Sequence, residues 1–351
     1  MRRKYGILRF FIILILGAGI LAGGWVFLTF HHRNVVTENG KTAFLLIPEG
    51  TDYEGLIDSL KAGGHLKFEQ TFRWAARREN LPYNVHAGRY AITHGMNNRE
   101  LARKLAMGWQ DPLNMTLSGS IRTFERLASV LARNLAIDSA SVLEHLKNDS
   151  LISSFGFDSA SLRGMFIPNT YEVYWTISEE ELLERMRREY DHFWNDQRKE
   201  KAKSIGLTQK QVSTLASIVN EETAKADEMP EVAGVYMNRL RKGMPLQADP
   251  TLIFAAQDYS IRRVLKKHTK IESPYNTYKY RGLPPGPISV PSIEALDAVL
   301  NYERHNYLYF CAKEDFSGYH NFAVTLNEHM KNARRFQRAL TLRLNQEGRA
   351  Q

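Results

Sequence analysis

LASIVNEETA, residues Leu215 to Ala224, is the stretch from which the rest of this chain is best understood, because it predicts a carboxylate on the buried face of a helix. The start of that helix is signalled by Thr208 and Gln211, which have the spacing of a capping box. At about 100° per residue, Val219 and Glu222 then fall on one apolar stripe. A buried carboxylate calls for a structural or a chemical explanation.

The two adjacent glutamates, Glu221 and Glu222, are predicted to behave as different acids. Desolvation on the apolar stripe disfavours the ionised form of Glu222, which raises its pKa toward the range that a general acid needs near neutral pH. Glu221 shares a stripe with Thr214 and Ser217, which we interpret as the solvated side. The alternative is that Glu222 lies at a frayed helix end and pairs with an arginine such as Arg239 in a structural role.

The amino terminus predicts a membrane anchor. FFIILILGAGILAGGWVFLTF, Phe10 to Phe30, carries no charge over 21 residues and follows the basic segment 1–9. The positive-inside rule predicts a cytoplasmic tip at 1–9, a transmembrane helix at 10–30 and an exported body. A cleaved signal peptide is the alternative, but the apolar run exceeds the usual length and no clear small-x-small site precedes His31.

Composition excludes several classes of protein. The chain has 351 residues, enough for two or three folded units, and a net charge of +9 that is partly concentrated in the amino-terminal tip. No basic block or aromatic-basic motif resembles a nucleic-acid module. Cys311 is the only cysteine, so an internal disulfide is excluded, and its apolar surroundings predict a buried structural thiol. The eleven histidines show no metal-ligand spacing, so neither a metal nor a cofactor is expected.

The region after the anchor predicts a small α+β unit. Residues 31–41 are polar and are interpreted as a linker, and residues 42–112 follow as the first domain. Two segments that start at Ile47 and Ile92 align at a spacing of 45 residues, each with the pattern of strand end, turn, helix and glycine stop. Between them FEQTFRWAARREN predicts a helix and AGRYAI a strand. An internal duplication and the general likeness of strand-turn-helix segments both explain the repeat.

Residues 113–351 are expected to form a mixed α/β catalytic domain. Up to Gly206 the pattern is mostly helical, except for GMFIPNTYEVYW, 164–175, which predicts a loop and an extended segment. A helix is expected over 230–243, because Pro lies near its first turn and Gly past its end. A hairpin around DFSG and a basic amphipathic helix from about Leu326 complete the chain.

Two segments of this last third carry candidate site residues. PLQADPTLIFA places Gln247 and Asp249 just before a predicted helix, where capping is the plain explanation for Asp249. SPYNTYKYRGLPPGPISVPS, 273–292, is rich in Pro, Gly and Tyr, and a long ordered loop in a compact domain is usually functional. Its candidate residues are Tyr275, Asn276, Thr277 and Tyr278.

Together these segments resemble the endolytic murein transglycosylases, the MltG or YceG-like family, over essentially the whole chain. The resemblance rests on LASIVNEETA, VAGVYMNRLRKGMPLQADPTLIFA, YNTYKYRGLPPGPIS and the closing elements around His320 and His329, all in one order. It implies one amino-terminal membrane helix, a LysM-like unit where we place residues 42–112, and an overall α+β fold. His320 and His329 are expected to bond within the domain.

The resemblance also implies which residue is catalytic. The family's glutamate lies in a motif resembling ASIVEKET, whose first and second acidic positions correspond to Asn220 and Glu222 here. Helical phase and resemblance therefore select Glu222. The chain departs from the family again where a motif resembling EGxxxPDTY carries Arg163 and Asn169 at two acidic positions, which puts the roles of those carboxylates in doubt.

The resemblance implies cleavage of the MurNAc-GlcNAc β-1,4 bond of peptidoglycan, which leaves 1,6-anhydro ends. It also implies an enzyme of the plasma (inner) membrane that ends glycan elongation beside cell-wall synthases. One carboxyl suffices for this lytic chemistry, and we expect Glu222 to act as acid and then base. Substrate contacts are expected from Gln247, Asp249 and residues 275–278. Two alternatives stay open: a water-using muramidase with Asp249 as second carboxylate, and a non-catalytic glycan-binding scaffold.

Overall fold

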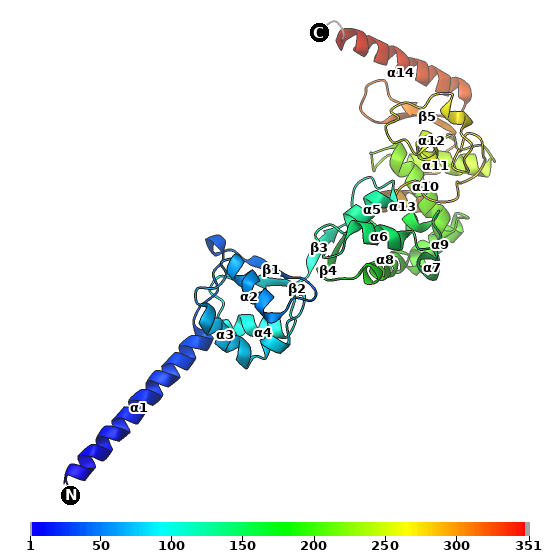
Figure 1. The fold of residues 1–351 in the computed structure, drawn as a ribbon. Coiled ribbons are helices and arrows are strands. Elements are labelled where there is room, and N and C mark those ends of the chain that lie inside the picture. The colour runs from blue at the N-terminus through cyan, green and yellow to red at the C-terminus, as the bar shows by residue number, and fades with distance from the viewer. Residues whose placement is uncertain (1, 348–351) are drawn as a thin grey trace. The chain divides into compact units, whose positions relative to one another are not determined.

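The computed structural model describes residues 2–347, and its contacts divide them into two compact units. The first unit comprises residues 2–115, 134–137 and 172–177. The second comprises 116–133, 138–171 and 178–347. The elements of both units are labelled along the chain in Figure 1. The protein is therefore of mixed α and β structure, as the sequence predicts, and each unit is described separately below.

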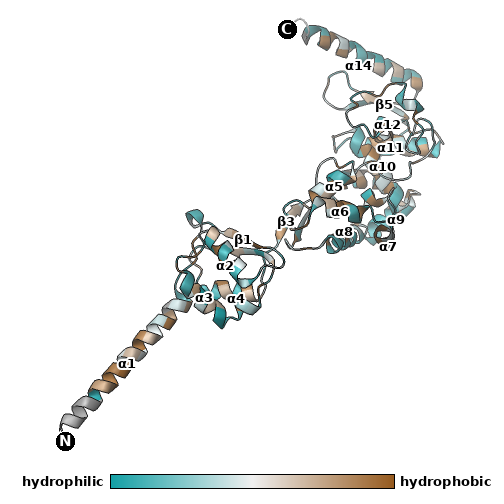
Figure 2. Ribbon diagram, in the orientation of Figure 1, coloured by the Kyte–Doolittle hydropathy of each residue, from teal (hydrophilic) through white to brown (hydrophobic). Residues whose placement is uncertain are grey.

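The first element is a long helix, α1 (Arg2–His31). Its stretch Arg9–His31 is long and apolar enough to cross a membrane. Figure 2 shows this run as the hydrophobic part of α1, and large side chains such as Ile13 and Leu21 are exposed along it. A helix that is apolar on all sides and exposes its large side chains over most of its length is typical of a membrane span.

The strand-helix-helix-strand order predicted for the first unit is present. It consists of β1 (Ala43–Ile47), α2 (Tyr53–Ala62), α3 (Glu69–Arg78) and β2 (Gly88–Ile92), followed by α4 (Asn98–Ala106). The strands pair antiparallel with Ala43 opposite Ile92. Each strand leads through a glycine of positive φ, Gly50 or Gly95, into a capped helix. Apolar side chains of all five elements form one core.

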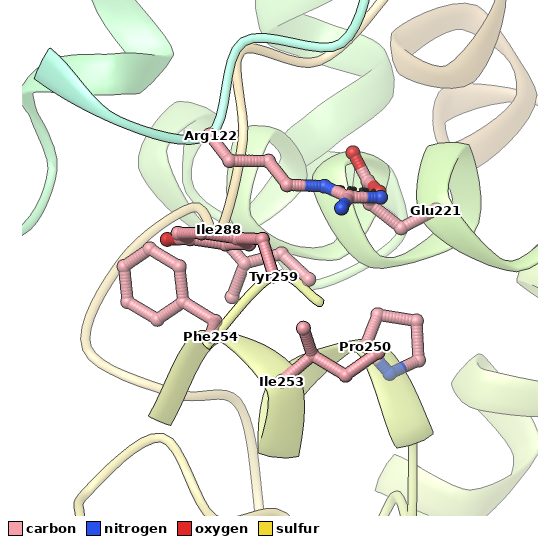
Figure 3. Close-up of a pocket in the computed structure, with 7 residues that line it drawn as sticks. All are labelled: Arg122, Glu221, Pro250, Ile253, Phe254, Tyr259 and Ile288. Carbon is pink, nitrogen blue, oxygen red and sulfur yellow. Dashed lines mark hydrogen bonds and ion pairs between the residues drawn. The ribbon is translucent and has the colours of Figure 1, made fainter. Parts of the chain in front are cut away.

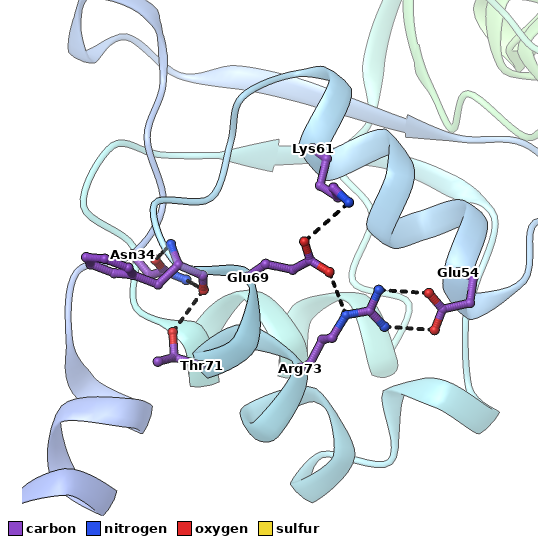
Figure 4. Close-up of polar contacts among 7 residues, drawn as sticks. Asn34, Glu54, Lys61, Glu69, Thr71 and Arg73 are labelled. Atoms are coloured by element: carbon purple, nitrogen blue, oxygen red, sulfur yellow. Dashed lines mark hydrogen bonds and ion pairs between the residues drawn. The ribbon is translucent and has the colours of Figure 1, made fainter.

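Polar contacts join α2 to α3 on the surface of this unit (Figure 4). The Arg73 guanidinium donates to both carboxylate oxygens of Glu54, at 2.7 and 2.8 Å, and to Glu69 at 2.7 Å. Asn34 accepts from the backbone N–H of Phe68 and donates to its carbonyl. Asn34 lies in segment 31–41, which the sequence analysis interprets as a linker, and the next residue, Val35, is fully buried. Part of that segment is thus packed into the first unit.

The second unit is mostly helical. Its helices are α5 (Phe124–Leu131), α6 (Ser139–Leu146), α7 (Asp149–Ser154), α8 (Glu179–Phe193), α9 (Asp196–Ser204), α10 (Gln209–Glu222), α11 (Met229–Arg241), α12 (Asp249–Ala256), α13 (Ile293–Leu300) and α14 (Leu326–Glu347). Its strands β5 (Tyr309–Ala312) and β6 (His320–Ala323) pair antiparallel. Strand β3 (Leu113–Thr116) pairs with β4 (Thr170–Val173), and the boundaries of the two units fall within these two strands. Short 3₁₀ turns lie at Leu162–Met165 and His268–Lys270 in this unit, and at Glu38–Gly40 and Leu81–Tyr83 in the first. The predicted hairpin and terminal helix are therefore confirmed.

Helix α10 is the centre of the second unit. It packs against α11, α12 and α13, and every residue from Val212 to Val219 is buried. The face with Thr214 and Ser217, interpreted from sequence as solvated, is 3% and 0% exposed, so that interpretation was wrong. The Ser217 hydroxyl accepts from the backbone N–H of Ile288 and donates to the Thr214 carbonyl. Small hydroxyl side chains let a neighbouring segment approach closely and pair with its backbone.

The loop 273–292 is ordered by close backbone packing. A Cβ at Gly286 would lie 2.0 Å from the carbonyl oxygen of Ala160, so only glycine fits at this crossing. Beyond it Ile288, Ser289 and Val290 are buried, and the backbone N–H of Val290 donates to Ile121. The second half of the loop is thus part of the interior, which leaves its first half to form the candidate site.

Candidate active site

Glu222 is the last residue of α10. The capping box of Thr208 and Gln211 fixes the start of the helix as the sequence predicts, and Leu215 and Val219 on the same stripe are fully buried. The Glu222 residue is half-buried, and Thr223 ends the helix in extended conformation. The carboxyl group therefore emerges from a rigid, buried helix and keeps part of its surface accessible.

The surroundings of Glu222 favour its protonated form. The pKa of this carboxyl is raised to about 7, mainly by burial and also by the negative charge of Asp249, while a hydrogen bond from Tyr236 and the charge of Arg239 act in the opposite direction. The alternative of a structural ion pair with Arg239 does not hold. The Arg239 guanidinium instead donates to the backbone carbonyls of Leu308 and Leu246, at 2.6 and 2.7 Å.

Tyr236 is the partner of Glu222 that sequence reasoning missed. It lies on α11, its side chain is 1% exposed, and its hydroxyl donates to Glu222 Oε1 at 2.6 Å. Burial raises the pKa of Tyr236 well above its ordinary value, so the phenol stays protonated. The Phe310 ring packs edge-on against it at 5.9 Å. One feature of the sequence could have pointed to Tyr236. The spacing of Val232, Tyr236 and Arg239 predicts that these residues share one buried face of α11.

Asp249 lies at the start of α12 but does not cap it. The N-cap is Ala248, which makes no side-chain cap, so the capping explanation for Asp249 was wrong. Its carboxylate is exposed and accepts a hydrogen bond from the Tyr278 hydroxyl at 2.5 Å. Burial, this hydrogen bond and the Asp249 charge raise the pKa of Tyr278, and Glu222 also contributes to the increase. The structure thus brings Glu222, Asp249 and Tyr278 into one electrostatic environment.

Asn276 and Thr277 hold the loop together from inside. Asn276 is 0% exposed, donates to the carbonyls of Thr269 and Ile271, and accepts from the backbone of Tyr278. Thr277 is 2% exposed, and its hydroxyl accepts from the Ala248 backbone N–H. Direct substrate contact by these two side chains, expected from sequence, is not what their buried and bonded positions support.

The other two residues predicted to contact substrate, Gln247 and Tyr275, differ from each other in exposure and in packing. Gln247 is exposed, in a left-handed backbone conformation with φ of 51°, and its N–H donates to the Thr277 carbonyl. Tyr275 is half-buried and its ring packs on Phe254 with centroids 4.6 Å apart. Of the predicted side chains, Asp249 and Tyr278 therefore interact electrostatically with Glu222, and Gln247 has an exposed amide two residues before Asp249.

Glu221 has surroundings opposite to those expected from sequence. Its side chain is only 6% exposed and forms an ion pair with Arg122, whose Nη2 lies 2.5 Å from Glu221 Oε2. Figure 3 shows this pair above a small cavity of about 50 Å³ that Tyr259 and Ile288 help to line. The prediction of a surface residue was wrong because α10 is buried on all sides from Val212 to Val219 and the Arg122 guanidinium pairs with the Glu221 carboxylate. Glu221 is a buried partner of Arg122.

Arg163 and Asn169, which replace acidic positions of the family motif, differ in burial. Arg163 is 9% exposed, donates through Nε to the Arg122 carbonyl, and lies over the Phe124 ring at 4.1 Å. Asn169 is exposed and its side chain accepts from the next backbone N–H. The arginine therefore joins the network that holds Arg122, while the asparagine is a surface residue.

His320 bonds within the domain, as expected. Its Nδ1 lies 2.8 Å from Glu228 Oε2, and the same carboxylate accepts from the Thr223 hydroxyl. His329 stacks on Tyr309, and burial lowers the pKa of its imidazole. Cys311 is half-buried on β5 and not fully buried as predicted. Among the described residues, 2–347, no three His, Cys, Asp or Glu side chains are grouped to hold a metal ion.

Comparison with known proteins assigns the chain to a defined family. Residues 45–335 match the model of the YceG-like family, and the chain belongs to that family.

Curated relatives and one solved structure agree with this assignment. The chain is 28% identical over 336 residues to the endolytic murein transglycosylase of Bacillus subtilis (strain 168), covering 91% of this chain and 90% of that protein. It is also 28% identical over 295 residues to the endolytic murein transglycosylase of Streptococcus pneumoniae (strain D39), covering 76% of this chain and 53% of the relative. The crystal structure of a YceG-like protein from Listeria monocytogenes matches with a TM-score of 0.56 and 25% identity, over 83% of this chain and 98% of that one.

Proposed function

We propose that this chain is an endolytic lytic transglycosylase that cleaves the MurNAc-GlcNAc β-1,4 bond inside peptidoglycan strands. The observation that carries the proposal is the half-buried Glu222 carboxyl, whose pKa is raised to about 7 and whose partner is a phenol and not a cation. A carboxyl group in this state can donate a proton near neutral pH. The names of the relatives support the same reaction and substrate class.

In the first step Glu222 acts as the acid. Because the Tyr236 hydroxyl donates to Oε1, the proton of the neutral carboxyl is carried by Oε2. That proton passes to the glycosidic oxygen as its bond to the anomeric carbon breaks, and the GlcNAc residue leaves with a free hydroxyl. Positive charge develops on the anomeric carbon. The Asp249 carboxylate, held by the Tyr278 hydroxyl, is the nearby anion suited to stabilise it.

In the second step Glu222 acts as the base. Its carboxylate accepts the proton of the C6 hydroxyl of the same N-acetylmuramyl residue while that oxygen bonds to the anomeric carbon. The product has a 1,6-anhydro end, no water is consumed, and Glu222 returns to its protonated form. The attacking hydroxyl belongs to the sugar already bound, so the step is intramolecular. Burial of Glu222 favours this reaction because it limits the approach of bulk water.

The glycan contacts are proposed for the accessible groups of residues 247–249 and of the first half of the loop. Gln247, Asp249 and Tyr278 supply an amide, a carboxylate and a phenol for sugar hydroxyls, and the Tyr275 ring supplies an apolar face. Asn276 and Thr277 act indirectly, because their bonds hold the backbone between residues 247 and 278 in place.

A water-using muramidase is the second candidate, because Asp249 places a second carboxylate close enough to raise the pKa of Glu222. Mass spectrometry of products from purified glycan strands separates the two reactions. The lytic reaction gives anhydro ends, each lighter by one water than a reducing end. Reducing ends alone would make the chain a hydrolase with Asp249 as its second carboxylate.

A glycan-binding scaffold is tested with Glu222→Gln. An enzyme of the proposed kind loses cleavage and keeps strand binding, because the amide has the shape of the acid without its proton. A variant with unchanged cleavage or an unchanged cell-wall phenotype would favour the scaffold.

The proposal places the enzyme in the plasma (inner) membrane, with residues 1–9 in the cytoplasm, helix 10–30 as a single span, 42–112 as a LysM-like unit and 113–351 as the catalytic domain outside. The apolar stretch Arg9–His31 and the basic residues before it support this topology. An anchored site acts on strands near their place of synthesis, so cell-wall synthases are the expected partners. Protease accessibility in sealed spheroplasts tests the orientation: the body should be digested from outside and the tip protected.

A further inference from the structure

The first unit contains a groove that the proposed reaction does not use. It has a volume of about 440 Å³ and lies between the carboxyl-terminal part of α1 and the neighbouring ends of α3 and α4. One wall consists of α1 residues, among them Gly23, Phe27 and Phe30, and the other end is lined by Arg78 and Arg99. The groove is thus apolar at one end and cationic at the other.

The groove has fixed walls because α1 is attached to the first unit. The Thr29 carbonyl accepts from the Asn98 side chain at 2.6 Å, and Asn98 in turn accepts from Asn34 at 2.6 Å. Asn34 and Asn98 are fully buried, and Thr29 is 2% exposed. The rings of Trp25 on α1 and Trp74 on α3 meet edge-to-face with centroids 5.0 Å apart. The membrane helix and the folded unit are therefore one packed body at this point.

The position of the groove along α1 places it in the outer leaflet of a bilayer. At about 1.5 Å per residue, the apolar stretch Arg9–His31 is about as long as the hydrocarbon core is thick, roughly 30 Å. Its carboxyl-terminal end, at His31, then reaches the lipid headgroups. Gly23 lies about 12 Å deeper, among the acyl chains. By the same measure Trp25 lies about 9 Å below His31, near the outer edge of the acyl chains.

At the charged end of the groove, Arg99 has an ionic partner among the described residues and Arg78 has none. Arg99 Nε lies 3.1 Å from Glu79 Oε1, so these two groove residues neutralise each other. Arg78 is exposed and, within the described residues 2–347, makes no hydrogen bond or ion pair that would satisfy its guanidinium. A guanidinium at headgroup level is well suited to bind a phosphate through paired hydrogen bonds.

We propose that this groove binds one phospholipid of the outer leaflet that has an anionic headgroup. Its phosphate contacts Arg78, and an acyl chain lies along Gly23 and Phe27 of α1. The order of the groove along the helix, apolar where the bilayer is apolar and cationic where the phosphates lie, matches a lipid in its bilayer orientation. The bound lipid holds the first unit against the membrane surface. This inference rests on the proposed membrane anchor and is independent of the reaction at Glu222.

Lipid binding is measured on the full-length chain in detergent by native mass spectrometry, with phosphatidylglycerol as the anionic probe and phosphatidylcholine for comparison. The structure offers two matched pairs of variants. Arg78→Glu and Arg77→Glu make the same charge change at adjacent exposed residues, but only Arg78 lines the groove. Gly23→Phe and Gly24→Phe add the same ring where a Cβ has open space, but only Gly23 lines the groove.

The expected result is one tightly bound phosphatidylglycerol on the wild-type chain, weakened about tenfold or more by Arg78→Glu, the size of one lost charge-assisted hydrogen bond. Gly23→Phe should weaken it similarly, and the Arg77 and Gly24 variants should stay close to wild type. Equal weakening of phosphatidylglycerol binding in both members of each pair would contradict lipid binding in the groove. So would a wild-type chain that retains no lipid. Carbonate extraction of vesicles separates this from the anchor: wild-type chain released from the membrane would refute the anchor itself.

Discussion

The two sides of α10 at its carboxyl-terminal end give adjacent glutamates opposite surroundings. On one side Glu221 meets the Arg122 guanidinium and is 6% exposed. On the other side Glu222 meets the Tyr236 phenol and the negative charge of Asp249. The residues are chemically identical and neighbours in sequence. Glu221 is paired with a cation, whereas burial and a nearby anion keep Glu222 protonated up to about pH 7, against the hydrogen bond from Tyr236.

The comparison teaches that burial alone does not make a catalytic acid. Both carboxyl groups are withdrawn from water, and only the one without a cationic partner is suited to donate a proton near neutral pH. Arg122 therefore has a second consequence: its ion pair holds the Glu221 side chain about 100° around the helix from Glu222. Four predictions test the difference between the two sides, from the largest expected effect to the smallest.

The largest difference should appear in activity. Glu222→Gln removes the proton donor and should lower the rate of glycan cleavage by about 10²–10⁴-fold, the usual contribution of a general acid. Glu221→Gln should retain most of the activity, because that carboxylate serves structure. Rates of product formation on purified strands measure both. A comparable loss in the two variants would mean that the sides of α10 are not functionally distinct.

The same pair of substitutions should change stability with opposite signs. The pKa of Glu222 is about 7 in the folded chain and 4.5 ordinarily, so the unfolded chain binds fewer protons between these values and stability falls as pH rises. Glu222→Gln should therefore raise the free energy of unfolding at pH 8, by at most about 3 kcal/mol. Glu221→Gln breaks a half-buried ion pair and should lower it by about 1–2 kcal/mol.

Urea unfolding at pH 5 and pH 8 measures these changes. The gain from Glu222→Gln should be much smaller at pH 5, and the loss from Glu221→Gln should persist at both pH values. A gain for Glu221→Gln, or a loss for Glu222→Gln at pH 8, would reverse the comparison.

Removal of the Tyr236 hydroxyl should affect Glu222 and leave Glu221 unaffected. The hydrogen bond from Tyr236 lowers the pKa of Glu222, so Tyr236→Phe should raise that pKa and move the alkaline decline of activity to higher pH. The lost bond also frees the carboxyl to rotate, which should lower the maximal rate by about tenfold. A pH-rate profile records both effects. A decline that moves to lower pH would show that Tyr236 does not stabilise the anion.

The smallest effect is expected when the negative charge of Asp249 is removed. The charge of Asp249 raises the pKa of Glu222, so Asp249→Asn should lower it and move the alkaline decline of activity to lower pH, opposite to Tyr236→Phe. Products of this variant should still carry anhydro ends. A variant that loses all cleavage would instead favour Asp249 as an essential second carboxylate.

Local rules predicted much of the fold. The capping box at Thr208, the glycine turns at Gly50 and Gly95, and the apolar run of α1 act through residues close in sequence, and the structure has each of them. The position of Glu222 on the buried stripe followed from helical period in the same way. These features needed no knowledge of what packs against them.

The errors arose where distant segments decide the environment. Thr214 and Ser217 indicate a solvated face by polarity, but the segment at Ile288 covers them and pairs with Ser217. Asp249 has the residue type of an N-cap, but Tyr278, 29 residues later, binds its carboxylate. Tyr236 could be placed on a buried face, yet its contact with Glu222 depends on how two helices pack. No local rule contains that information.

The central claim is that Glu222 holds its proton near neutral pH, and its titration is the most direct test. The ¹³C signal of the Glu222 carboxyl, identified in glutamate-labelled protein by its absence from Glu222→Gln, is followed against pH. The account predicts a midpoint near pH 7. A midpoint at or below the ordinary value of 4.5 would contradict it, because the carboxyl would then be ionised where the enzyme has to donate a proton.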